Sequence, residues 1–389
     1  MVTLRTASDW LSPAFLADPY PHYRELRESD PVHRDGDDRW IITRHADVTA
    51  ILRDDARFSA QQDGSGSMLV SDPPKHTRLR SIVSKAFTPR AVDALAPRIE
   101  RIVNDLLDEI EASGDRDVEI IARFAYPLPI TVIAELLGVE KEHRDLFREN
   151  GQHVALMLGP IADPHTSAVA ATARNELFRY FEDLIARRRA EPQDDLVSAM
   201  IAAEDAGDRL SHQEVLSTLF LLLVGGHETT VNLVANGVLA MIRNPDQLAL
   251  FTSGDVNPAT AVEELLRYDP PVHYTGRIAA ADVELHGKTI RRGEPVRLIL
   301  AAANRDPEAF TDADGLDLRR DPNPHLAFGW GTHFCLGAPL ARLEARIALP
   351  AMLRRFPQPQ LIDGTPLRYR SGAVLRGLEE LPLRLRPTP

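Results

Sequence analysis

The sequence predicts a mainly α (α+β) protein that folds as a single domain over residues 1–389, with a small β-rich region. Three observations support this prediction. Apolar residues recur at helical spacing through about 75–270 and again over 337–355. No repeat, low-complexity block or linker interrupts the chain. Strand-like segments gather in three parts of the chain, about 30–60, 275–300 and 360–389.

Local signals predict the individual elements. Two prolines open a helix over 20–29, because proline is tolerated in the first turn. Aromatic and β-branched residues over 39–43 predict a strand, and a helix follows over 46–53. Glycines and serines over 60–67 indicate a surface loop, and glycine turns divide strands over 283–300. Further helices are expected at 75–87, 91–112, 122–137 (kinked or delayed by Pro127 and Pro129), 144–157, 168–190 and 211–243.

Charge and cysteine content exclude several classes of protein. A net charge of -12 does not suit a nucleic-acid partner, which needs a basic field. One cysteine allows no intrachain disulfide and fits a reducing compartment. The first ten residues lack the apolar core of a signal peptide, and the longest apolar run, 219–224, is far shorter than the ~20 residues that span a membrane. We therefore expect a cytoplasmic monomer without a membrane or nucleic-acid partner.

The single cysteine, Cys335, lies in the segment FGWGTHFCLG, residues 328–337. Three glycines before a helix indicate a tight backbone that another group approaches closely. At a helix N-terminus the macrodipole and free N–H groups lower the pKa of a thiol and favour the thiolate, a soft ligand for haem iron. The alternative is a buried structural cysteine, the commoner case for a lone thiol. The glycines, with His333 and Phe328 at these spacings, favour the ligand.

This segment resembles the haem-binding loop of the cytochrome P450 family, F-G-x-G-x-H-x-C-x-G, at every fixed position. The resemblance implies a P450 fold, with haem b as cofactor and Cys335 as the ligand of its iron. It implies that Phe328 packs beside the thiolate and that His333 reaches a haem propionate. Gly337 would let the porphyrin approach closely, and Gly329 belongs to the same cofactor-binding set.

A second motif, LFLLLVGGHETT, occupies residues 219–230. Gly225 and Gly226 cost about 1 kcal/mol each relative to alanine inside a helix. Close helix packing would explain them as well as function does. The adjacent Glu228 and Thr229 favour function, because an acid and a hydroxyl beside a helix irregularity can hold water and pass protons.

The same motif resembles the (A/G)-G-x-(D/E)-T segment that crosses the haem face in cytochromes P450. The resemblance implies that Thr229 hydrogen-bonds the iron-bound peroxide and that Glu228 relays protons. Gly225 and Gly226 would open the groove that admits oxygen. His227 is treated as incidental.

Haem propionates need cations or hydrogen-bond donors. His76 and Arg80 lie four residues apart in PPKHTRLR, on one helical face. Such a face is commonly just solvated. The segment resembles the P-P-x-H-x-x-x-R helix that grips a propionate in the family, and Arg277 matches another propionate arginine.

Glu264 and Arg267 are three residues apart on a predicted helix. This spacing alone indicates only an exposed ion pair on the helix surface. They resemble the E-x-x-R pair that cytochromes P450 bury near the haem loop. The family completes this cluster with an arginine or histidine where this chain has Gly315. Arg319 or Arg320 are the alternatives for the missing charge.

The resemblance implies a monooxygenase that inserts one oxygen atom from O2 into a substrate by hydroxylation or epoxidation. Electrons would come from NAD(P)H through a separate ferredoxin and ferredoxin reductase, because the chain carries no flavin or ferredoxin motif. Candidate residues for docking the ferredoxin, or otherwise plain surface charges, are Lys75, Arg78, Arg342 and Arg346.

We expect a medium-sized lipophilic substrate such as a polyketide, macrolide or terpenoid, and a role in natural-product biosynthesis. The alternatives are a P450 that performs coupling or another non-insertion reaction, or a non-catalytic haem or recruitment protein. The intact acid and hydroxyl of Glu228 and Thr229 count against the last. Candidate substrate contacts are Met68, Leu69, Val70, Val224, Val272, Tyr274 and Val374, together with the region 157–161.

Overall fold

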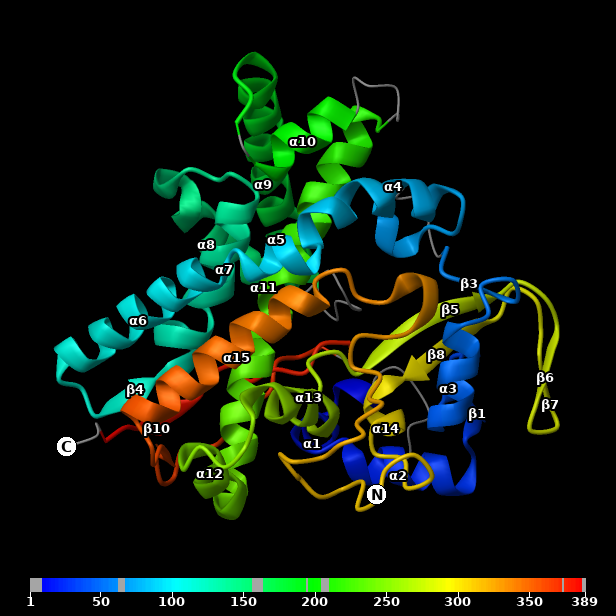
Figure 1. Cartoon of the computed structure of the whole chain (residues 1–389). Coiled ribbons are helices and arrows are strands. Elements are labelled where there is room, and N and C mark those ends of the chain that lie inside the picture. The colour runs from blue at the N-terminus through cyan, green and yellow to red at the C-terminus, as the bar shows by residue number, and fades with distance from the viewer. Residues whose placement is uncertain are drawn as a thin grey trace.

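The structure of the chain is a computed structural model. Helices fill most of the molecule and the largest sheet lies at one side (Figure 1). The long helix α11 (His212–Arg243) runs through the middle of the helical part, and α15 (Ala338–Arg355) packs across it. The structure describes residues 9–61, 67–155, 164–193, 195–203, 210–372 and 374–386.

The helices begin and end close to the expected positions. Ser211 caps α11, because its hydroxyl accepts a hydrogen bond from the Glu214 N–H and the Glu214 carboxylate accepts one from the Ser211 N–H. The other described α-helices are α1 (Pro13–Ala17), α2 (Tyr20–Ser29), α3 (His45–Leu52), α4 (Lys75–Val83), α5 (Pro89–Asp93), α6 (Ala96–Ser113), α7 (Pro127–Leu136), α8 (Arg144–Ala155), α9 (Pro164–Ala190), α10 (Leu196–Ala203), α12 (Pro245–Thr252), α13 (Pro258–Tyr268) and α14 (Leu300–Ala303).

Proline positions explain where the observed helices differ from the expected ones. The helix expected over 122–137 is a π-helix, Ile121–Ala125, followed by α7, which starts at Pro127. Proline has no N–H to donate and therefore suits the first turn of a new helix. The helix expected over 91–112 likewise divides into α5 and α6, with a proline near the start of each.

Three sheets contain the described strands. The largest has the order β1-β2-β8-β5-β3, in which β2 and β8 are parallel and the other neighbours are antiparallel. A second sheet, β4-β10-β9, includes a strand within the region expected to be helical, since β4 is too short to show a periodicity. The strands are β1 (Val32–Arg34), β2 (Trp40–Ile42), β3 (Phe58–Ser59), β4 (Asp117–Glu119), β5 (Tyr274–Ala279), β6 (Val283–Leu285), β7 (Lys288–Ile290), β8 (Pro295–Ile299), β9 (Gln360–Leu361) and β10 (Pro382–Arg384).

The main hydrophobic core surrounds α11. This helix is long and apolar enough to cross a membrane by length and composition, but 72% of its most apolar window is buried inside the fold. A helix that is hydrophobic on nearly all sides packs in this way at the centre of a large domain. Within the described residues no other helix meets the same test.

A buried ion pair joins α13 to the segment that precedes the cysteine loop. Glu264 and Arg267 have no exposed side-chain surface, and Arg267 donates two hydrogen bonds to the carboxylate, at 2.7 and 2.8 Å. Arg320 adds a third cation, with its Nε 3.0 Å from Glu264 Oε2. Arg267 also donates to the Gly315 carbonyl. Of the two alternatives for the missing charge, Arg320 is therefore the one at the pair, whereas Arg319 is exposed.

We predict that Arg267→Met lowers the free energy of unfolding by about 3–5 kcal/mol, because it leaves the Glu264 carboxylate buried without its main partner. The matched control is Arg319→Met on the exposed neighbour, which should change it by less than about 0.5 kcal/mol. Urea unfolding followed by circular dichroism measures both values. Equal effects of the two substitutions would contradict the assignment.

Candidate functional site

The cysteine loop comes directly before α15 and packs against the end of α3. Gly329 and Gly331 adopt the left-handed region, with φ of 68° and 72°. A Cβ at Gly331 would lie 2.5 Å from the Leu52 carbonyl oxygen, so only glycine fits there. The Cys335 N–H donates to the Phe328 carbonyl at 2.9 Å and closes the loop. The glycines thus set the backbone that presents Cys335 ahead of the helix.

The thiol of Cys335 corrects one expectation from the sequence. Burial raises its pKa, and this outweighs the N–H groups of Gly337 and Ala338 and the charges of Arg80 and Arg342, all of which lower it. The helix N-terminus was expected to make the thiolate the favoured form by itself. In this structure it only partly offsets the effect that raises the pKa of the thiol.

Two histidines and two arginines gather beside the loop. The rings of His76 on α4 and His333 have centroids 4.2 Å apart. Burial, and then the neighbouring His76 and Arg277, lowers the pKa of His333 to about 4. The pKa of His76 is also lowered, first by burial and then by Arg80. Both rings are therefore neutral at pH 7, while the arginines carry the charge.

Several polar atoms of this group lack partners in the part of the chain that the structure describes. His76 Nδ1, His333 Nε2 and Arg277 Nε are buried there without a hydrogen bond. Arg80 donates one hydrogen bond to the Phe334 carbonyl, at 2.6 Å. Unpaired buried donors are rare in folded proteins and need an explanation. An anionic group with several acceptor oxygens, such as the carboxylates of a haem, would satisfy them.

Glycines also leave room where a flat cofactor would be needed. No heavy atom lies within 4 Å of a Cβ built at Gly225 or at Gly337, from α11 and the cysteine loop respectively. Thr229 lies one turn after Gly225 and donates to its carbonyl at 2.8 Å. The residues present therefore fit a haem held between the loop and α11.

α11 differs from the expectation in two respects. The helix is continuous through Gly225 and Gly226, whereas the sequence suggested an irregularity. A Cβ at Gly226 would lie 3.0 Å from Ile133 on α7, so this glycine permits close helix packing. Only Gly225 faces open space. Gly225 therefore leaves room for a cofactor, whereas Gly226 allows α11 to pack against α7.

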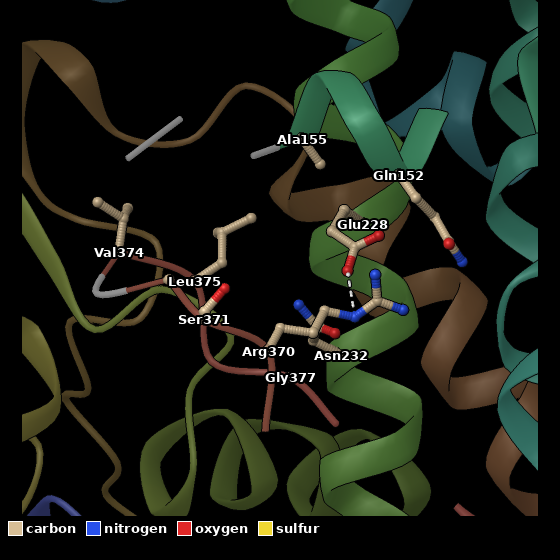
Figure 2. A pocket seen from close by; sticks show the side chains of 10 residues that line it. Gln152, Ala155, Glu228, Asn232, Arg370, Ser371, Val374, Leu375 and Gly377 are labelled. Atoms are coloured by element: carbon tan, nitrogen blue, oxygen red, sulfur yellow. Dashed lines mark ion pairs between the residues drawn. The ribbon is translucent and has the colours of Figure 1, made fainter. Parts of the chain in front are cut away.

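Glu228 faces a small pocket that is lined by apolar residues and by the polar side chains of Gln152, Asn232 and Arg370 (Figure 2). Its side chain is 2% exposed, and its Oε1 lies 3.5 Å from Arg370 Nε. His227 is fully buried, its Nδ1–H donates to the Leu223 carbonyl at 2.8 Å, and burial is the main cause that lowers its pKa. Within the described residues no hydrogen bond joins Glu228 to Thr229, so a proton passing between them would need water.

The candidate substrate residues separate into two groups. Val374 lines the pocket of Glu228, and Val272 forms a strand bridge with the adjacent Leu375. Tyr274 instead packs in the N-terminal cluster, with its ring 6.0 Å from Trp10 and 4.8 Å from the Arg297 guanidinium.

The remaining candidates for substrate contact have mixed environments. Met68 and Val224 are buried in the main core, whereas Leu69 is 50% exposed and Val70 is half-buried. The region 157–161 lies outside the described residues.

Ion pairs restrict the candidate docking residues for a ferredoxin. Arg78 pairs with Glu214 at 2.5 Å, and Arg342 pairs with Glu263 at 2.6 Å. Lys75 is exposed. Paired arginines still present positive edges, but their charge is partly compensated.

Two charged residues of the site region were missed by the sequence. Arg370 gave no signal, because its contact with Glu228 joins segments 142 residues apart. Glu344 is buried on α15 beside Thr230 of α11, and burial raises its pKa to about 8. A lone acid among the apolar residues of that helix was its only sequence signal.

Comparisons with known proteins agree with this site. The family described as Cytochrome P450 matches residues 42–249 and 259–367. The chain is 43% identical to cytochrome P450 monooxygenase PikC of Streptomyces venezuelae over 96% of this chain and 92% of that protein. It is 40% identical to 6-deoxyerythronolide B hydroxylase of Saccharopolyspora erythraea, over 98% of this chain and all of that protein. The solved structure of P450BioI with an acylated acyl carrier protein superposes with a TM-score of 0.89 at 38% identity, over 96% of this chain and 99% of that one.

The fold and site thus define a haem-thiolate oxidoreductase. The chain belongs to the cytochrome P450 family and is a monooxygenase that uses haem iron and O2. Its relatives act in polyketide and other natural-product biosynthesis, which supports oxygenation of a lipophilic substrate.

We predict that Glu344 makes stability fall as pH rises. Its pKa is about 8 in the folded protein and near 4.5 when unfolded, so the folded state keeps a proton that the unfolded state loses. The free energy of unfolding should fall by on the order of 1 kcal/mol per pH unit between those values, relative to Glu344→Gln.

Urea unfolding at several pH values measures this difference, with Glu100→Gln on the exposed face of α6 as the control. The control should run parallel to the wild type. A constant offset between wild type and Glu344→Gln across the range would show that Glu344 is ionised in the folded protein.

Proposed function

We propose that Cys335 is the thiolate ligand of haem iron in a cytoplasmic, monomeric monooxygenase. The observation that carries this assignment is the glycine-shaped loop that presents the only cysteine of the chain next to unpaired buried donors. A metal ion deprotonates a coordinating thiol outright, and this would offset the raised pKa of Cys335. Haem bound there supplies oxygen activation, with overall conversion of R–H, O2, two electrons and two protons to R–OH and water.

The surrounding residues bind and orient the cofactor. Arg277 and Arg80 supply charge for the propionates, and His76 and His333 supply neutral hydrogen bonds. Phe328 lies near the cysteine under the guanidinium of Arg342, whose carbon is 4.5 Å from the ring centroid. The remaining cofactor-binding residues are Gly225, Gly329 and Gly337, whereas Gly226 packs against α7.

Thr229 and Glu228 move protons in this proposal. The Thr229 hydroxyl donates to the Gly225 carbonyl of its own helix, and its oxygen can still accept a hydrogen bond. Glu228 takes up protons on the pocket side. General acid–base groups of this kind contribute about 10²–10⁴-fold to a rate.

The substrate is a medium-sized lipophilic natural product, on this proposal. Support comes from the apolar residues Val272, Val374 and Leu375 near the pocket and from relatives named for polyketide and vitamin D3 hydroxylation. Electrons come from NAD(P)H through a separate ferredoxin and its reductase. A P450 that performs a non-insertion reaction is the second candidate, and product analysis separates the two.

We predict that the reduced carbonyl complex of the haem-loaded protein shows the red-shifted Soret band of a thiolate ligand. Cys335→Ser should abolish this band, since a hydroxyl is a poorer and less electron-rich ligand. The difference spectrum measures both. An imidazole-type spectrum in the wild type would contradict the assignment.

We predict that Thr229→Ala leaves haem incorporation intact but diverts most reducing equivalents to hydrogen peroxide. Removing the hydroxyl removes a proton donor on the oxygen side of α11. The ratio of peroxide formed to NADPH consumed measures the effect, and Thr229→Ser, which keeps a hydroxyl, is the control. Equal ratios in wild type and Thr229→Ala would argue against the relay.

A further inference from the structure

The pocket behind Glu228 lies between α8, α11 and the C-terminal residues 370–372 and 374–377, and it has room for about two water molecules (Figure 2). Polar side chains reach it from three directions: Gln152 from α8, Asn232 from α11, and Arg370 from the C-terminal segment. Most of the pocket surface is apolar, so these polar side chains mark the part of it that can hold water, which needs two to four polar partners.

Glu228 depends on this pocket for its partners. Among the described residues, neither of its carboxylate oxygens has a hydrogen-bond partner, and Asn232 Nδ2 is also buried without one. His227 lies with its Nε2 4.0 Å from Glu228, but burial lowers its pKa and keeps it neutral. An isolated buried carboxylate is costly. Arg370 is therefore the charged group that stabilises it.

The backbone of the C-terminal segment fixes Arg370. The Arg370 N–H donates to the Gly377 carbonyl at 2.9 Å, and its Nε donates to the Leu378 carbonyl at 3.2 Å. Further along, the Val374 carbonyl accepts from the His273 N–H at 2.8 Å. These bonds tie the turn to the rest of the fold on both sides, so the guanidinium has little freedom to leave Glu228.

The contact between Arg370 and Glu228 is longer than that of the buried structural pair Arg267–Glu264. Arg267 holds Glu264 with two hydrogen bonds at 2.7 and 2.8 Å, whereas Arg370 Nε stands 3.5 Å from one oxygen of Glu228. The second oxygen of Glu228 has no arginine partner. A carboxylate held in this way keeps its position and still has a free oxygen for proton exchange with water.

We propose that Arg370 is a positioning residue of the proton relay. It holds Glu228 at the wall of a hydrated pocket, so that a proton moves from pocket water to the free carboxylate oxygen and leaves it again toward Thr229. Glu228 then returns to its carboxylate form, and bulk water supplies the net proton. This inference rests on the proposed role of Glu228 and Thr229.

The test uses the haem-loaded protein with dioxygen, NADPH and an excess of a plant-type ferredoxin and its reductase. The rate of oxygen consumption is measured in H2O and in D2O. We expect Arg370→Gln to slow consumption by about 10-fold and to raise the solvent isotope effect, because proton transfer becomes limiting. Arg370→Lys, which keeps a positive charge, should restore most of the rate and an isotope effect near that of the wild type.

A double-mutant cycle separates positioning from a general structural effect. If Arg370 acts through Glu228, then Arg370→Gln adds no further loss in a Glu228→Gln background. The control is Arg368→Gln, two residues away in an exposed pair with Glu379, which should leave the rate and the isotope effect unchanged.

Two outcomes would overturn the inference: a wild-type rate and isotope effect in Arg370→Gln, or a loss that is fully additive with that of Glu228→Gln. If Arg370→Gln does not retain haem, Arg370→Met takes its place, and a wild-type rate and isotope effect in Arg370→Met count against the inference. The carbonyl spectrum of the wild type is recorded first. If the wild type lacks the red-shifted band, the haem-thiolate assignment is wrong. If the band is present and only the Arg370 variants fail to behave as expected, the positioning role of Arg370 is wrong.

Discussion

The buried carboxylate of Glu264 is the constraint on which the arrangement of the site depends. It receives Arg267 from its own helix, Arg320 from the following irregular segment and the Asp317 N–H at 2.9 Å. Buried charges of this kind are expensive unless every lone pair is used, so the cluster tolerates few alternative geometries. It thereby fixes the segment that leads into the cysteine loop, and the Asn304 side chain continues this link by accepting from the Leu326 N–H at 2.6 Å.

Beside the proposed haem site, buried charge lacks the compensating partners that it has around Glu264. The protein buries Arg277 without a carboxylate partner and keeps His76 and His333 neutral. A folded protein without an anion there would hold unpaired donors, which is unfavourable. Binding a group with two carboxylates removes that penalty, so cofactor binding and folding stability are coupled. The pKa of Cys335 is also raised in the protein alone. Bound iron would lower it, because a coordinated thiol is deprotonated.

The sequence predicted those parts of the site that are encoded in short segments. The loop around Cys335, the Glu264–Arg267 spacing and the Glu228–Thr229 pair are local patterns, and the helix boundaries followed from caps and prolines. Arg320 and Arg370 could not be singled out, because each acts on an acid from a segment far away in the chain. Tyr274 was expected beside the substrate and packs against Trp10 instead, because strand residues alternate between two faces whose environments the sequence does not specify. The pKa of the thiol was misjudged because local helix effects were weighed without burial.

The central claim is that the sulfur of Cys335 binds iron, and resonance Raman spectroscopy of the ferric protein tests it most directly. The chain has one cysteine, so growth with ³⁴S-labelled cysteine under conditions that leave methionine unlabelled marks that sulfur alone. The account predicts an iron–sulfur stretching band that shifts to lower frequency with the heavier isotope. A spectrum without such a band, or a band that does not move, would contradict it.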